Sequence, residues 1–178
     1  MRTLKTTNAI LLLATVMLAG CRSSVMMEYF FEHDINEDEI RYEQLPERVQ
    51  EYHEVCHTPG DIKGIYVGQL SLYNKKAYKI AFTDGGEMLF DKRGRCIFME
   101  NWKDGLPDCW TSQIPIYDAL YMTITLQMAD LNPDSKPWNI RCLEIHPNCY
   151  LVKAGIGEDI YQFMFDKKGK LLGIGIEI

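Results

Sequence analysis

The chain lacks any excess of positive charge. It has 19 Lys and Arg against 25 Asp and Glu, and its formal net charge is −6. It contains no basic cluster with interleaved aromatic residues that could replace counterions along a phosphate backbone. The composition therefore argues against nucleic acid as a partner, and a cationic protein partner suits the charge better.

The sequence also lacks the motifs of two common kinds of reaction chemistry. No Ser lies in a nucleophile elbow, and no Gly-rich loop could cradle a phosphate. The adjacent acids Glu37, Asp38 and Glu39 are more typical of a solvated surface than of an acid/base pair. We therefore predict neither a cofactor nor an enzymatic activity from these features.

The segment Asp34-x-Asn36-x-Asp38 resembles the first positions of a calcium-binding loop. The sixth position of the pattern is Glu39 where the sharp turn requires Gly, and the twelfth is Leu45 where a bidentate Glu is required. The segment is therefore interpreted as a solvated lead-in rather than a metal site.

The apolar run of residues 9–18 is too short to span a bilayer. It follows Arg2 and Lys5, which is the arrangement of a secretory signal. The next residues, Leu18-Ala-Gly-Cys21, resemble the lipobox of bacterial lipoproteins. That resemblance implies cleavage before Cys21 and acylation of its thiol and new amino group, which would anchor the protein to a membrane.

Removal of residues 1–20 would leave 17 basic residues against 25 acidic ones, a formal charge of −8. Residues 22–25 lack the acidic cluster of surface-exported lipoproteins. We therefore expect a lipid-anchored protein of the bacterial cell envelope that faces the periplasm, with residues 21–42 as its tether.

Two stretches share one pattern. In residues 87–98 and 162–172, an apolar run leads into Phe-Asp-Lys-basic-Gly, and a second apolar run follows. Asp91 and Asp166 can accept hydrogen bonds from backbone N–H groups just ahead, and Gly94 and Gly169 suit a positive φ. Each stretch is predicted to be a β-hairpin.

The elements around these hairpins predict a repeated architecture. Leu45-Pro46 and Ile114-Pro115 each begin a helix. Residues 115–129 fit both a strand and a helix, and the matching Pro start favours the helix. Each helix is followed by about four antiparallel strands. We therefore expect an α+β fold of two repeats, residues 43–101 and 114–178, each with one helix on a sheet, joined by a linker at 102–113.

This pattern resembles the PepSY-like, β-lactamase-inhibitor-like family, whose members are small exported proteins of gut Bacteroidetes, often in tandem copies. The resemblance covers residues 43–178 and is clearer in the first half, because the second half lacks the Pro-Gly helix stop and the Asp-Gly turn. It implies a non-enzymatic binding or inhibitory role and supplies no functional residues. The positions that carry it are Leu45, Pro46, Val49, Pro59, Gly60, Ile62, Tyr78 to Phe82, Asp84, Gly85, Phe90, Asp91 and Gly94.

Five cysteines remain after the leader: Cys56, Cys96, Cys109, Cys142 and Cys149. An extracytoplasmic compartment permits disulfides, and the odd count leaves at least one thiol unpaired. Cys142 with Cys149, or Cys96 with Cys109, are candidate pairs. The alternative is that most of the five are small buried apolar residues.

One motif favours an enzyme. His53-Glu54-x-x-His57 has the zincin spacing, with two His one helical turn apart and Glu54 as general base. The longer zincin pattern would place its third ligand at Lys63, which is a poor zinc ligand. His53 and His57 flank the apolar stripe of the helix, and the second half has Met122, Thr123 and Leu126 at the aligned positions. A zinc metallopeptidase is therefore the alternative function.

The preferred function is a binding module for a protein or peptide. Trp102 and Trp110 in the linker are candidate interface anchors; equally, they could fill the seam between the halves, as could Trp138. Gly173 and Gly175 in the last strand would leave the outer face of the sheet low enough for close approach. These four residues are the candidate partner-binding positions.

Overall fold

A computed structural model describes residues 38–55, 62–70, 75–100, 102, 104–132 and 134–177. The predicted signal peptide, the lipidation site Cys21 and most of the tether lie outside the described residues. The same is true of Cys56, His57, Pro59 and Gly60.

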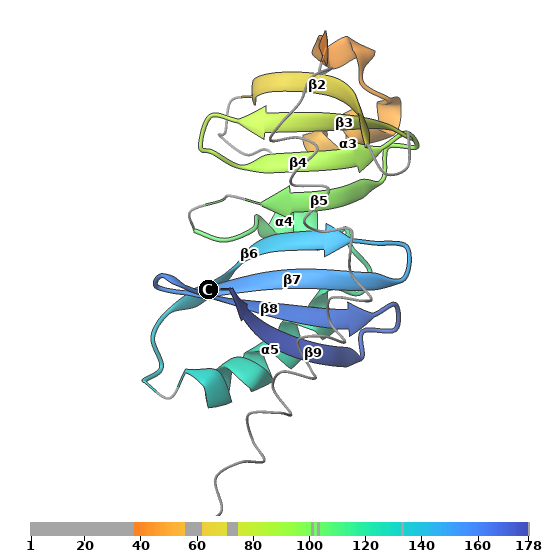
Figure 1. Cartoon of the computed structure of the whole chain (residues 1–178). Helices are drawn as coiled ribbons and strands as arrows, with labels where there is room; N and C mark the ends of the chain where they lie inside the picture. The colour runs from red at the N-terminus through yellow and green to blue at the C-terminus, as the bar shows by residue number, and fades with distance from the viewer. Residues whose placement is uncertain are drawn as a thin grey trace, which may run out of the picture.

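The protein is built on one antiparallel sheet of nine strands, which lie side by side in chain order (Figure 1). The strands are β1 (Asp38–Glu39), β2 (Ile62–Leu70), β3 (Lys75–Phe82), β4 (Glu87–Asp91), β5 (Cys96–Glu100), β6 (Trp138–Ile145), β7 (Cys149–Ile156), β8 (Asp159–Asp166) and β9 (Leu171–Glu177). The helical elements are η1 (Tyr42–Gln44), α3 (Glu47–Glu54), α4 (Asp108–Thr111) and α5 (Tyr117–Leu131).

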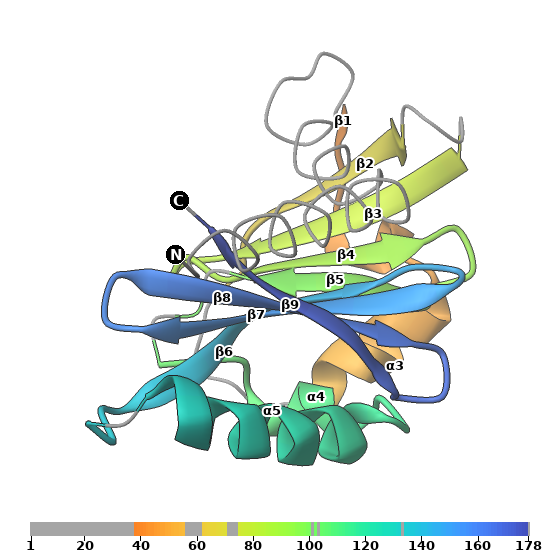
Figure 2. The same ribbon diagram turned by 60° about the horizontal axis from the view of Figure 1, so that its bottom comes forward.

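The α-helices α3, α4 and α5 lie on one face of the sheet (Figure 2). Tyr78, Ile80 and Phe82 alternate along β3 and are buried in the core, because every second residue of a strand points to the same face. Among the described residues, no helix combines the length and apolar composition needed to cross a membrane.

The predicted helix at residues 115–129 is confirmed as α5. Leu120, Ile124 and Met128 recur at every fourth position and are buried, whereas Met122 and Leu126, which a strand would place on the same face, are 60% and 66% exposed. The predicted first helix is confirmed as α3, where the carbonyl of Pro46 accepts hydrogen bonds from the N–H groups of Val49 and Gln50. The positions of the two hairpins are likewise confirmed.

The predicted fold class, an α+β fold of two separate helix-on-sheet repeats, is wrong. β5 pairs with β6 through Phe98 with Glu144, Met99 with Leu143 and Glu100 with Cys142. The two expected sheets are therefore one sheet, more of the described residues lie in strands than in helices, and one core cluster contains residues from both halves. The physical reason is that separate sheets would leave the edges of β5 and β6 with unpaired backbone groups, and pairing satisfies both.

Candidate binding surface

The two predicted glycines lie together at one end of the sheet. In the register of β8 and β9, Gly173 is opposite Met164 and Gly175 is opposite Gln162, so both glycines belong to the same face. A Cβ built on Gly175 would meet no heavy atom within 4 Å. The sheet surface is therefore low and open at this position.

The other face of β9 carries exposed apolar side chains. Ile174 is partly buried against the core, whereas Ile176 is 61% exposed. Leu172, which lies where the register shifts between Met164 and Phe165, is 54% exposed. β9 therefore combines a bare glycine face with aliphatic side chains that have little cover.

An ion pair marks the end of the glycine face. Nζ of Lys153 on β7 lies 3.5 Å from Oε1 of Glu177 on β9. The pair reaches across β8 and lies beside Gly175, since Gln162 is the partner of both Lys153 and Gly175 in the register. The carboxylate side chain is 46% exposed and remains accessible to a second cation.

The turn between β8 and β9 fixes where β9 begins. Oδ1 of Asp166 accepts hydrogen bonds from the N–H groups of Lys168 at 2.8 Å and Lys170 at 2.9 Å. Gly169 has a φ of 81°, which L side chains rarely adopt, and a Cβ there would lie 3.1 Å from Cδ1 of Ile116. The hydrogen bond from Lys170 holds the pKa of the Asp166 carboxyl below its usual value.

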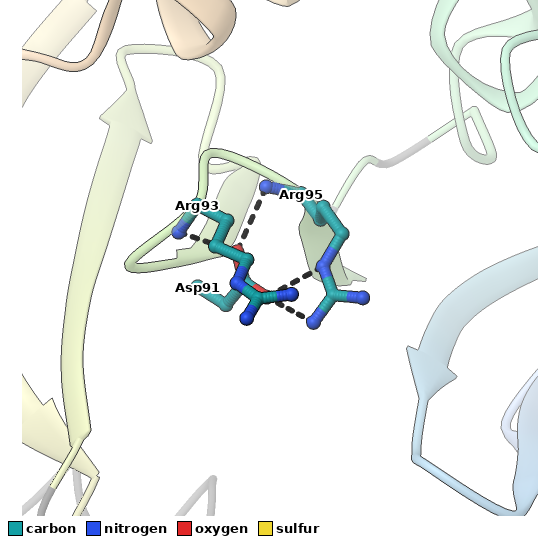
Figure 3. Close-up of polar contacts among 3 residues, drawn as sticks. All are labelled: Asp91, Arg93 and Arg95. Carbon is teal, nitrogen blue, oxygen red and sulfur yellow. Dashed lines mark hydrogen bonds and ion pairs between the residues drawn. The ribbon is translucent and has the colours of Figure 1, made fainter.

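The equivalent turn in the first half has an additional cation. Oδ1 of Asp91 accepts hydrogen bonds from the N–H groups of Arg93 and Arg95, at 2.8 and 3.0 Å (Figure 3). The Arg95 guanidinium also contacts Oδ2, with Nε at 2.7 Å and Nη2 at 2.6 Å. Burial raises the pKa of the Asp91 carboxyl, but the hydrogen bonds and the charge of Arg95 outweigh it and lower the pKa.

The His53 ring packs against the aromatic core. It stacks on Phe82 with centroids 6.0 Å apart, and its Nδ1 lies 3.3 Å from the Tyr42 hydroxyl. The same hydroxyl lies 3.4 Å from Oε1 of Glu54. Burial lowers the pKa of His53, although the nearby charge of Glu54 opposes this.

The predicted zinc site is only partly described, because His57 lies outside the described residues. Within the described part of the chain, no three His, Cys, Asp or Glu side chains form a group that could hold a metal ion. The contact with Tyr42 occupies Nδ1 of His53 and connects it to Glu54. The packing of the His53 ring on Phe82 and Trp110 favours a structural position for this residue.

The predicted linker tryptophans are in the core. Trp102 is 7% exposed and Trp110 is fully buried, with their ring centroids 5.4 Å apart and both in contact with Phe82. Their burial favours the seam-filling interpretation over interface anchors. Trp138 is partly buried and stacks on Tyr121 of α5.

Neither candidate disulfide is present. Cys109 is disulfide-bonded, but its partner is not Cys96, Cys142 or Cys149, which are buried thiols. The register pairs Cys142 with Lys153, four residues along β7 from Cys149, so the two are about 13 Å apart along the strand. The interpretation of these three thiols as small buried residues is confirmed, and burial raises the pKa of Cys96 to about 12.

Sequence reasoning missed a buried polar pair formed by Glu144 of β6 and His146, which follows the end of this strand. Nε2 of His146 lies 2.8 Å from Oε2 of Glu144, and both side chains are at most 5% exposed. The two residues are separated by two positions and share a face of the sheet. The i, i+2 spacing of an acid and a histidine at the end of a predicted strand was the available signal.

No family model matches the sequence, and no curated protein matches it. Several solved structures match the chain, and three of them come from Bacteroides. The first, a candidate periplasmic protein of the DUF2874 family from Bacteroides vulgatus ATCC 8482, is 21% identical with a TM-score of 0.62; the match covers 80% of this chain and 99% of that one.

The second is a candidate calcium-regulated periplasmic protein from Bacteroides thetaiotaomicron, 21% identical with a TM-score of 0.60, and the match covers 78% of this chain and 96% of that one. The third is a candidate periplasmic protein of unknown function from Bacteroides vulgatus ATCC 8482, 17% identical with a TM-score of 0.58, covering 79% and 99%. At these identities the likeness establishes the fold. The PepSY-like resemblance stays a prediction.

Proposed function

We propose that the chain is a lipid-anchored binding module of the bacterial cell envelope, which captures a protein or peptide without catalysis. The observation that carries the proposal is the open surface at Gly175, where a Cβ would meet no heavy atom within 4 Å, with Gly173 on the same face of β9. Exposed aliphatic side chains at Leu172 and Ile176 adjoin it. The fold shared with proteins described as periplasmic supports the location.

The test of this surface is the double substitution Gly173→Lys with Gly175→Lys. Two long cationic side chains would cover the open surface, and we expect loss of specific partners captured from the cell-envelope extract, identified by mass spectrometry. Met122→Lys with Leu126→Lys is the matched control, since it adds the same charge at two exposed positions on α5. Equal capture by both variants and the native protein would overturn the proposal.

The proposed anchor has its own experiment. Acyl chains hold a protein at a bilayer by burying CH₂ groups. We expect Cys21→Ser to abolish incorporation of labelled fatty acid and to move the protein from the membrane fraction to the soluble fraction. Unchanged fractionation would contradict the anchor and leave the binding surface untouched.

The zinc peptidase alternative is less well supported, because the His53 ring packs on Phe82 and Trp110 in the aromatic core. Metal analysis of the purified protein and a peptidase assay of Glu54→Gln separate the two functions. We expect no stoichiometric zinc. Stoichiometric zinc, with peptidase activity that is lost in Glu54→Gln, would favour the enzyme.

A further inference from the structure

Resting on the proposed function, we propose that the partner binds as an added strand along β9, supplying an extended segment in which aromatic and aliphatic residues alternate next to a basic residue. The two parts of this inference are the mode of binding, which the backbone of β9 supports, and the chemistry of the segment, which its side chains support.

The backbone of β9 has one unpaired side. β9 is the last strand of the sheet and pairs only with β8 among the described strands. Its seven residues extend about 24 Å, at roughly 3.4 Å per residue. Such an edge presents a row of N–H and C=O groups to which an extended peptide can add.

Among the described strands, the opposite edge of the sheet ends in a short acidic strand, whereas β9 has no strand beyond it. β1 has two residues, Asp38 and Glu39, and both are exposed acids. A short charged strand is a common way to prevent edge pairing. β9 contains neither Pro nor Lys, and its one charged residue is Glu177. The register shift near Leu172 leaves Gly173–Glu177 as the regularly paired part.

The glycine face indicates large side chains on the added strand. Gly173 and Gly175 present no side chains there, and aromatic residues on a neighbouring strand can cover such glycines. On the other face, Ile174 and Ile176 favour aliphatic partners. The accessible carboxylate of Glu177 favours a Lys or Arg opposite it.

A second copy of this chain fits the edge less well. An antiparallel pairing of two β9 strands, centred on Ile174, Gly175 or Ile176, would set a glycine against another glycine or against Glu177. The bare surface would then stay uncovered. An antiparallel partner with the order basic, aliphatic, aromatic, aliphatic, aromatic fills each position along Gly173–Glu177.

The test uses a fluorescein-labelled peptide, Arg-Val-Phe-Val-Phe with Gly-Ser flanks, and fluorescence anisotropy with the mature protein. Two further peptides carry N-methyl groups on one or the other alternate set of backbone amides. Strand addition requires hydrogen bonds from only one set, so one methylated peptide should bind roughly tenfold more weakly and the other should bind like the parent. Failure of the parent peptide to bind, or equal binding of all three peptides, would overturn the proposal.

Protein variants place the peptide on the molecule. We expect Ile176→Lys to weaken binding roughly tenfold, because it puts a charge on the apolar side of the edge. Met122→Lys, an equally exposed position on α5, should leave binding unchanged, and circular dichroism verifies that both variants fold. If sedimentation shows a dimer of the native protein and Ile176→Lys dissociates it, the edge is occupied by a second copy of this chain. That result would overturn the proposal of a peptide partner.

The experiments distinguish failure of strand addition from failure of the proposed binding surface. If the double lysine variant at Gly173 and Gly175 loses envelope partners but N-methylation of the peptide has no effect, strand addition is wrong and the binding surface stands. If the lysine variant also retains all envelope partners, both are wrong.

Discussion

The two halves of the sheet use the same turn but are covered in different ways. In both, an aspartate carboxylate accepts hydrogen bonds from the backbone N–H groups of the residues on either side of a glycine with positive φ. In the first half, the glycine lies against Val49 of α3; in the second, it lies against Ile116 just before α5. The repeated pattern therefore fixes the turn and its place beside the start of a helix.

The helices themselves are unequal. α3 has eight residues and buries only Val49, whereas α5 has 15 residues and buries Tyr117, Leu120, Ile124 and Met128. Aromatic rings replace the missing helical cover in the first half, where Trp102 and Trp110 contact Phe82. The hydroxyl of Tyr52 on α3 donates a hydrogen bond to the carbonyl of Trp110 at 2.8 Å. Equivalent turns thus tolerate very different packing above them.

The largest effect is expected from the buried face of α5. Leu120→Ala should lower the free energy of unfolding by about 2–5 kcal/mol, because it leaves a cavity in the core. Leu126→Ala in the same helix is the control; Leu126 is 66% exposed, and the expected change is within about 0.5 kcal/mol. Urea denaturation measures both. Similar losses for the two variants would show that the outer face of α5 is covered.

A smaller difference is expected between the two turn glycines. Gly94→Ala and Gly169→Ala should each cost roughly 1–2 kcal/mol, because both positions have positive φ. Gly94→Ala should cost more: its Cβ would lie 3.0 Å from Cβ of Arg48, close to the helix backbone, whereas Gly169 faces the flexible end of Ile116. Thermal or urea unfolding ranks them, and the reverse order would contradict the comparison.

The smallest effect is a difference in pH dependence. Both aspartate pKa values are lowered in the folded protein, so each carboxylate stabilises the fold above the unfolded pKa near 3.9, and this contribution is lost as the pH falls through the lowered folded value. Asp91→Asn and Asp166→Asn should therefore have a lower free energy of unfolding than the native protein at pH 7. This difference should shrink toward pH 2. Asp91→Asn should show the larger difference, since Arg95 also loses its partner. Differences in the free energy of unfolding that stay constant with pH would contradict the lowered pKa values of the two aspartates.

Local features of the fold were predictable from the sequence. The start of α5 after Pro115, the Asp91 and Asp166 turns and the alternation along β3 each depend on residues close together in the chain. The glycines of β9 were identified for the same reason, because strand alternation alone places Gly173 and Gly175 on one face.

The joining of the halves was not predictable, because no local signal pairs Phe98 with a residue as distant as Glu144. The burial of Trp102 and Trp110 depends on the same long-range pairing, because it places the segment between β5 and β6 over the core. The edge character of β9 likewise follows from the order of all nine strands.

Both halves of the described chain form one sheet and share one main core. Pulsed amide hydrogen exchange along a urea titration tests this arrangement most directly, by following β4 (Glu87–Asp91) and β7 (Cys149–Ile156) in the same sample. Because β5 and β6 are paired and the core contains residues from both halves, we predict that β4 and β7 lose protection at the same urea concentration. Loss of protection in one at a clearly lower concentration, while the other stays fully protected, would contradict this arrangement.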